Sequence, residues 1–198
     1  MVAVAGMADV DRVVEIIARA FTTDPVWGVA LARPDGSTDH CAAFWRPYVE
    51  GAMRHSSVYL AEGASAVAVW LPPGCDEMTE SQEADVLSVV ETSLPAASKP
   101  AMLELWDRFT AARPQEEPHA YLSLLATDPD HRGRGVGQQL LRENLQQFDA
   151  QHLPAYLEST NPANNHRYER AGFTHRGQFT STFDSASIAT LWRPVGGF

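Results

Sequence analysis

A glycine- and arginine-rich segment follows directly after a short apolar run, and this pattern is suited to binding an anion. The run Ala120–Ala126 is continuous and bounded, so it predicts a buried strand. It leads through a turn into Arg132-Gly-Arg-Gly-Val-Gly and then into a helical apolar stripe. The first NH groups of a helix lack partners within the helix and attract anions, and glycine lets the backbone approach a ligand. We therefore predict a phosphate or pyrophosphate site between Arg132 and Gly137.

Two common phosphate-binding loops are excluded by the residues that follow these glycines. A Walker loop ends in Gly-Lys-Ser/Thr, whereas Gly137 is followed by Gln138 and Gln139. A dinucleotide fingerprint needs G-x-G-x-x-G, and the place of its last glycine is held by Gln138 or Leu140. Mononucleotide and dinucleotide sites are therefore not expected. A tight strand-to-helix turn without a ligand is the alternative interpretation of the glycines.

Composition favours one soluble domain that spans residues 1–198. Solubility alone would explain its negative charge, and attraction of a small cationic substrate is the alternative interpretation. The chain is 44% hydrophobic and carries a net charge of −10, which is unfavourable for binding nucleic acid. It has no apolar stretch of about 18 residues and no basic leader, so we expect a cytoplasmic protein without a membrane partner. Cys41 and Cys75 form neither a disulfide framework nor a zinc motif, and no metal is expected.

The periodicity of apolar residues predicts an α+β domain around this loop. A helix is expected from Val10 to Phe21, capped by Asp9, and a second from about His40 to Arg54. Pro47 is expected to interrupt or bound the second helix. The other expected elements are strands at 2–5, 58–61, 66–71, 120–126, 155–159, 173–183 and 188–192, and helices within 76–112, 136–150 and 162–171. The last strand, 188–192, is a candidate for pairing across a homodimer.

The glycine-rich segment resembles the signature of the GNAT family of N-acetyltransferases. Arg132-x-x-Gly135-x-Gly137 is similar to the family pattern R/Q-x-x-G-x-G/A. It also stands in the expected place, after a strand and an acidic Asp-Pro turn. The resemblance covers about residues 118–180, and the first hundred residues match only in the order of their elements.

A second motif resembles the closing segment of the same family. In that segment an asparagine stands seven residues before a tyrosine, and a Gly-Phe pair follows the tyrosine. The corresponding residues here are Asn161, Tyr168 and Gly172-Phe173. The sequence Leu-Glu-Ser-Thr-Asn-Pro, with His119-x-Tyr121 upstream, is especially similar to the puromycin N-acetyltransferase branch. Two motifs at the family's spacing strengthen each other.

The resemblance implies an α/β/α sandwich with a mixed, mostly antiparallel sheet. Two parallel strands, Ala120–Ala126 and Ala155–Ser159, would splay apart and hold acetyl-CoA, the acyl donor, between them. The residues implied to contact this cofactor lie on the first splayed strand, on the loop and beside the short helix: Leu124, Leu125, Ala126, Arg132, Gly133, Arg134, Gly135, Val136, Gly137, Gln138, Asn161, Asn164 and Tyr168.

The implied chemistry is direct attack of a small-molecule amine on the thioester. A protonated amine has no free electron pair, so a base or a water chain must remove a proton. A strand NH near Leu125 would stabilise the developing oxyanion. The resemblance gives Tyr168 the role of protonating the leaving thiolate, and a core tyrosine packed on Phe173 is the alternative interpretation.

The general base is open among residues of the two splayed strands. Glu158, His119 and Tyr121 are candidates, acting directly or through water, and a structural role is an alternative for each. Strand alternation is expected to place His119, Tyr121, Ser123 and Leu125 on one face.

Acceptor recognition is expected from the N-terminal helices and from residues 76–112. Aromatic and acidic side chains there would suit a hydrophobic cation, with a packed core as the alternative interpretation: Phe21, Trp27, Phe44, Trp45, Tyr48, Trp106, Asp24, Glu50 and Asp107. Two other functions remain open, a catalytically inactive acyl-CoA-binding sensor and a protein or peptide N-acetyltransferase.

Overall fold

The computed structural model describes residues 2–197, which form one seven-stranded sheet in the order β1-β2-β3-β4-β5-β7-β6. All neighbouring strands are antiparallel except β4 and β5, which confirms the expected mixed, mostly antiparallel sheet. The strands are β1 (Ala3–Val4), β2 (Val58–Leu60), β3 (Ala66–Leu71), β4 (Ala120–Thr127), β5 (Ala155–Ser159), β6 (Thr174–Thr180) and β7 (Ser187–Arg193).

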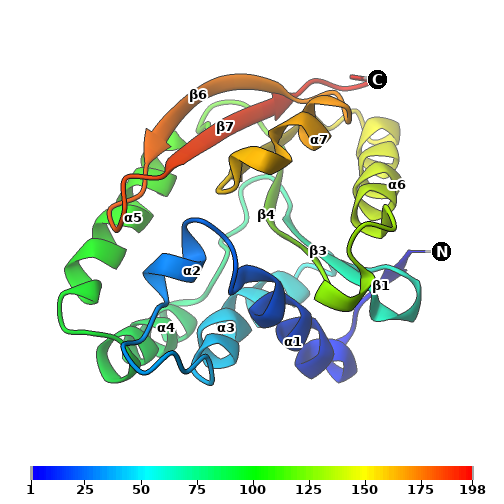
Figure 1. Ribbon diagram of the computed structural model, residues 1–198. Helices are drawn as coiled ribbons and strands as arrows, with labels where there is room; N and C mark the ends of the chain where they lie inside the picture. The colour runs from blue at the N-terminus through cyan, green and yellow to red at the C-terminus, as the bar shows by residue number, and fades with distance from the viewer. Residues whose placement is uncertain (1, 198) are drawn as a thin grey trace.

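Helices cover both faces of the sheet. One face carries α1 (Val10–Phe21), α2 (Trp27–Ala30), α3 (Cys41–Met53), α4 (Glu80–Ser93) and α5 (Ser98–Ala112). The other carries α6 (Val136–Ala150), with α7 (Asn165–Glu169) following β5. Figure 1 shows α1, α3 and α4 grouped together, apart from α6. None of the helices formed by residues 2–197 has the length and apolar character needed to cross a membrane.

Three local expectations are corrected. The Asp9 carboxylate does not cap α1, because it accepts a hydrogen bond from the Gly6 NH at 2.9 Å. Pro47 lies inside α3 and does not end it. Strand β7 lies between β5 and β6, so both of its edges are already paired. Pairing of β7 across a dimer is therefore excluded, whereas a homodimer through another surface stays a prediction.

Strands β4 and β5 separate halfway along their length, as expected for the splayed pair. They pair only from Ala120 to Leu122 on β4 and from Ala155 to Leu157 on β5. Beyond Leu122 the chain of β4 has β3 as its only neighbouring strand among the described residues. One edge of β4 is therefore open toward the separated end of β5.

A bulge at Ser123 breaks the alternation expected along β4. Trp70 of β3 pairs with Leu122, whereas Val69 pairs with Leu124, which leaves Ser123 as an extra residue. Leu124 therefore packs on the α1 side of the sheet together with Tyr121, and Leu125 packs on the α6 side. The prediction that Leu125 shares the face of Tyr121 is wrong for this reason.

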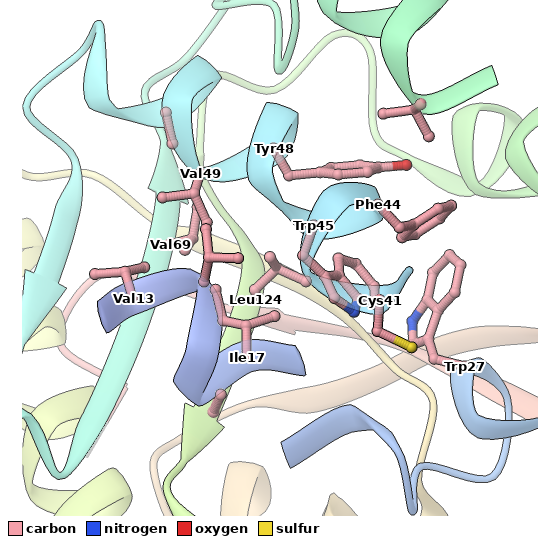
Figure 2. Close-up of a cluster of buried hydrophobic side chains, with 14 of the residues drawn as sticks. Val13, Ile17, Trp27, Cys41, Phe44, Trp45, Tyr48, Val49, Val69 and Leu124 are labelled. Carbon is pink, nitrogen blue, oxygen red and sulfur yellow. The ribbon is translucent and has the colours of Figure 1, made fainter. Parts of the chain in front are cut away.

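The larger core holds α1 and α3 against the centre of the sheet. Val13 and Ile17 of α1 pack with Val69 and Leu124 of the sheet and are almost fully buried. Figure 2 shows this group with the aromatic residues of α3 beside it. Burying each such side chain contributes about 1.5–3 kcal/mol. This packing fixes the end of α1, from which Asp24 follows.

Candidate active site

Two cavities meet above the separated strands. The loop cavity, of about 550 Å³, lies between the glycine-rich loop, the end of β4 and α7. The aromatic cavity, of about 580 Å³, lies between α2, α3, α5 and the splay point. They share the residues Phe21, Asp24, Leu125, Asn161, Asn164 and Tyr168. A molecule bound in one cavity would therefore contact a molecule bound in the other.

The glycine-rich loop presents unused NH groups to its cavity. Gly133 and Gly135 have φ angles of +77° and +75°, which glycine adopts readily. None of the NH groups from Gly133 to Gln138 donates to another residue within 2–197. The Arg132 NH, by contrast, donates to the Pro129 carbonyl at 3.4 Å, so the free NH groups begin one residue later than expected.

The loop is anchored to α1 through a buried carboxylate. Asp128 is 1% exposed and accepts hydrogen bonds from Arg12 and Arg19 of α1 and from the Asp130 NH. Burial opposes ionisation of Asp128, but these donors hold its pKa below the ordinary value. The Arg132 guanidinium adds a bond to the Ala20 carbonyl at 3.0 Å. These bonds therefore hold the loop in a fixed position against α1.

Most residues predicted to hold the cofactor line the loop cavity. Leu124 lines only the aromatic cavity, and Arg134 lines neither. The Asn161 side chain uses its oxygen to accept from the Ala163 NH. Arg167 also lines the cavity and was not among the predicted residues. The predicted residues on the loop cavity are Leu125, Ala126, Arg132, Gly133, Gly135, Val136, Gly137, Gln138, Asn161, Asn164 and Tyr168.

Asp24 and Tyr168 stand where the two cavities join. The Asp24 carboxylate accepts hydrogen bonds from the Val26 and Trp27 NH groups, both at 3.0 Å, and from the Thr160 hydroxyl at 2.8 Å. Burial raises the pKa of Asp24, and these bonds partly oppose that rise. Burial, with a contribution from the Asp24 charge, raises the pKa of Tyr168 to about 12. The junction therefore holds a carboxylate beside a hydroxyl that keeps its proton at neutral pH.

Glu158 lies at the point where β4 and β5 separate, and it lines only the aromatic cavity. Both carboxylate oxygens are fully buried, and no residue of the described chain meets them in hydrogen-bond geometry. Burial raises the pKa of Glu158 to about 7, while Arg113 and the nearby Tyr121 and Tyr156 hydroxyls oppose the rise. Its proton is therefore held more tightly than that of an exposed glutamate.

Because the pKa of Glu158 is raised, the folded protein should lose stability as pH rises toward neutral. In Glu158→Gln this loss should be absent. The unfolded chain loses the proton near pH 4.5 and the folded chain near pH 7, so this group's contribution falls as pH rises between those values. At about 1.4 kcal/mol per pKa unit, the loss is about 3 kcal/mol. Urea denaturation at pH 4.5 and pH 8 should show the wild type losing about that much more than the variant. The exposed Asp85→Asn serves as control, and equal pH dependence in wild type and Glu158→Gln would show that Glu158 ionises normally.

His119 lies outside both cavities. Its Nδ1 is 2.6 Å from the Glu117 carbonyl, and its ring packs edge-on against Tyr156 and Trp192. Burial lowers the pKa of His119, which favours the neutral ring. The structure thus brings Tyr168 and Glu158 to the aromatic cavity and leaves His119 apart from them.

The aromatic cavity is lined by more carboxylates than cations. Five acidic residues and one arginine line it, and the aromatic residues include several that also belong to the core. Of the acids predicted for acceptor recognition, Asp24 lines the cavity, whereas Glu50 and Asp107 do not. Glu77 and Arg113 line it and had no signal in the sequence. The acids are Asp24, Asp76, Glu77, Glu83 and Glu158, and the aromatic residues are Phe21, Trp27, Trp45, Tyr48, Trp106, Phe109, Tyr121 and Tyr168.

Part of this site lies in a segment that matches a family model. Residues 101–173 match the model of the acetyltransferase (GNAT) family, and they include β4, the glycine-rich loop, α6, β5 and α7. The rest of the chain, including Asp24 and Glu77, lies outside this match.

Solved structures share the fold over nearly the whole chain. One is a crystal structure from Corynebacterium glutamicum, described as histone acetyltransferase HPA2 and related acetyltransferase. It is 23% identical, with a TM-score of 0.68, over 99% of this chain and 96% of that one. Arylalkylamine N-acetyltransferase 2 from Aedes aegypti is 12% identical, with a TM-score of 0.71, over 99% of both chains. Polyamine N-acetyltransferase from Drosophila melanogaster is 16% identical, with a TM-score of 0.64, over 98% of this chain and 99% of that one. Residues 101–173 thus match the model of the GNAT family, and the chain shares the fold of these acetyltransferases along nearly its whole length.

Proposed function

We propose that this protein transfers an acetyl group from acetyl-CoA to a primary amine of a small molecule. The observation that carries the proposal is the meeting of the two cavities at Asp24 and Tyr168. One cavity has unused NH groups for an anion, and the other is aromatic and acidic. A thioester from the first and an amine from the second would meet at the junction.

The residues of the loop cavity fit the acyl donor. The free NH groups from Gly133 to Gln138 lie at the positive end of α6 and would bind the pyrophosphate of CoA. Arg132 and Arg167 add positive charge at the same cavity. The open edge of β4, from Leu124 to Ala126, offers NH and carbonyl groups to the amide-containing arm of CoA.

The aromatic cavity fits an amine with an apolar body. Its excess of carboxylates would raise the local concentration of a cation, and its aromatic faces would contact that cation favourably. Arylalkylamine and polyamine N-acetyltransferases share the fold, which supports a small amine as acceptor. The similarity to the puromycin N-acetyltransferase branch rests on sequence motifs alone and stays a prediction.

In the proposed reaction, Asp24 and Tyr168 move the two protons. Asp24 accepts a proton from the acceptor ammonium, and the freed nitrogen forms the C–N bond to the acetyl carbon. As the C–S bond breaks, Tyr168 donates its proton to the sulfur, and the second proton leaves the attacking nitrogen and returns to the Tyr168 oxygen. The products are the amide, the free thiol and protonated Asp24, which then releases its proton to solvent. Burial favours this assignment, because it raises the pKa of Asp24 and makes it a stronger base. A main-chain NH near Leu125 is the proposed donor to the oxyanion.

Glu158 is the second candidate for the base. A proton would reach its buried oxygens only through neighbouring groups such as the Tyr121 hydroxyl, whereas Asp24 lines both cavities. We therefore place Asp24 first. His119 has no proposed role in the reaction, because it lines neither cavity.

Donor binding is tested by Gly135→Val. Valine disfavours the φ angle of +75°, so the loop NH groups would turn away and acetyl-CoA binding should weaken at least tenfold. Gly63→Val is the matched control, because Gly63 has a φ angle of +66°, lies in the β2–β3 turn and lines neither cavity. An added Cβ has no atom within 4 Å at either position. Isothermal titration calorimetry measures both variants, and unchanged binding by Gly135→Val would remove the loop from the donor site.

Acetyl transfer is tested by mixing the protein with acetyl-CoA and each member of a panel of aryl and alkyl amines. The free thiol of CoA, released by the reaction, is measured over time. Turnover with members of the panel supports the proposal. Tight acetyl-CoA binding without any turnover would favour the sensor, and an acetylated lysine or N-terminus in a partner protein would favour protein acetylation. Absence of binding by both acetyl-CoA and CoA at millimolar concentration would reject the proposal.

A further inference from the structure

A second carboxylate, Glu77, faces the aromatic cavity from the loop between β3 and α4. Its side chain is 19% exposed, so a bound molecule can reach it. Glu77 lines only this cavity, whereas Asp24 lines both. The cavity therefore has one carboxylate at the junction with the loop cavity and another away from it.

The position of Glu77 is built into the fold. Its carboxylate accepts a short hydrogen bond from the hydroxyl of Ser123, the extra residue of the β4 bulge. Its backbone packs closely on Gly51 of α3, where an added Cβ would lie 1.9 Å from the Glu77 carbonyl oxygen. Arg54 also donates to the carbonyl of the preceding Asp76 at 3.2 Å. These contacts fix the direction of the Glu77 side chain.

The charge around Glu77 is not balanced by the chain. Arg113 lies with its Nη2 at 3.8 Å from a Glu77 oxygen, and its guanidinium stacks over the Tyr121 ring at 3.8 Å. The same guanidinium is the cation that acts on Glu158, whose oxygens have no hydrogen-bond partner in the described chain. Above pH 7, where Glu158 is ionised, one positive charge thus serves two carboxylates. A second cation would complete this group.

Aromatic groups surround the exposed side of Glu77. The charges of Glu77 and Glu83 act on the Tyr48 hydroxyl, which also lies beside Trp106. Figure 2 shows this hydroxyl pointing away from Val13, Val69 and Leu124. A carboxylate beside aromatic faces is a favourable place for an ammonium or guanidinium group.

We propose that Glu77, with Tyr48 and Trp106, forms a second cation site, so that the acceptor is a bifunctional amine with cationic groups at both ends. One end is acetylated beside Asp24, the apolar middle lies along Trp27 and the neighbouring aromatic walls, and an ammonium or guanidinium at the other end pairs with Glu77. The inference rests on the proposed function, because it assumes that the aromatic cavity receives the acceptor.

The test compares two amines that differ only at their far end, p-xylylenediamine and p-methylbenzylamine. Calorimetry on the wild-type protein with CoA present should show at least tenfold tighter binding of the diamine, because hydrogen bonds to charged groups have effects of this size. In Glu77→Gln the ratio should fall to about one, with binding of the monoamine unchanged. Glutamine keeps an oxygen for the Ser123 hydroxyl, so it changes charge more than shape.

Asp85→Asn is the matched control, since Asp85 is an exposed acid on α4 that does not line the cavity. It should keep the full preference for the diamine. Equal binding of both amines by the wild type would overturn the inference whether or not Glu77→Gln folds, as would a preference that survives in a folded Glu77→Gln. The readout needs no turnover, so absence of acetyl transfer with a retained diamine preference would reject the enzyme reaction and keep the cation site.

Discussion

Replacing Tyr168 by phenylalanine should lower kcat for acetyl transfer by about 10²–10⁴, the range expected when a general acid is removed. Tyr168 lines both cavities, and burial raises the pKa of its hydroxyl to about 12. It therefore carries its proton at neutral pH, as the proposed general acid must. Phenylalanine keeps the ring that packs edge-on against Phe173, with centroids 6.1 Å apart.

Thiol release in stopped time courses measures kcat, and calorimetry with CoA measures donor binding, which should stay within about twofold. Tyr59→Phe is the matched control, because Tyr59 is a half-buried tyrosine on β2 that lines neither cavity. An unchanged kcat in Tyr168→Phe would mean that solvent protonates the thiolate. A parallel loss of CoA affinity would give Tyr168 a binding role.

The glycine-rich loop, the proposed donor half of the site, could be predicted because its signals are local in the sequence. The apolar run before the loop, the alternate glycines and the helical stripe after them specify a strand, a turn and a helix within about thirty residues. The structure has β4, the loop and α6 at these places, and β5 has the expected bounds, Ala155–Ser159. Local backbone geometry alone makes an anion site at the start of a helix, so no distant contact is needed to predict it.

The proposed acceptor half could be predicted only in part, because it is assembled from distant segments. Asp24, Glu77 and Glu158 face one cavity although they come from the end of α1, the loop before α4 and the splay point. Which acid faces inward depends on packing, such as the contact of Glu77 with Gly51. The bulge at Ser123 is likewise set by pairing with β3, and it reversed the expected face of Leu125.

Replacing Asp24 by asparagine should lower kcat/KM by about 10²–10⁴, the other large effect, because it removes the proposed base. Asparagine keeps an oxygen to accept from the Val26 and Trp27 NH groups, so the turn before α2 should be retained. The base must be ionised to act, so kcat/KM of the wild type should rise with pH through the pKa of Asp24, which burial has raised. This low-pH limb should be absent in Asp24→Asn.

Thr160→Val tests whether the pKa of Asp24 controls the reaction, because it changes that pKa and leaves the carboxylate in place. The Thr160 hydroxyl donates to Asp24 at 2.8 Å and lowers the pKa of that carboxyl, so its removal should move the low-pH limb of kcat/KM to higher pH with only a several-fold loss of rate at high pH. A limb that does not move in Thr160→Val, survives in Asp24→Asn and disappears in Glu158→Gln would transfer the base to Glu158. The pH profile therefore distinguishes two buried carboxylates that a loss of rate alone would not, because the Thr160 bond acts on only one of them.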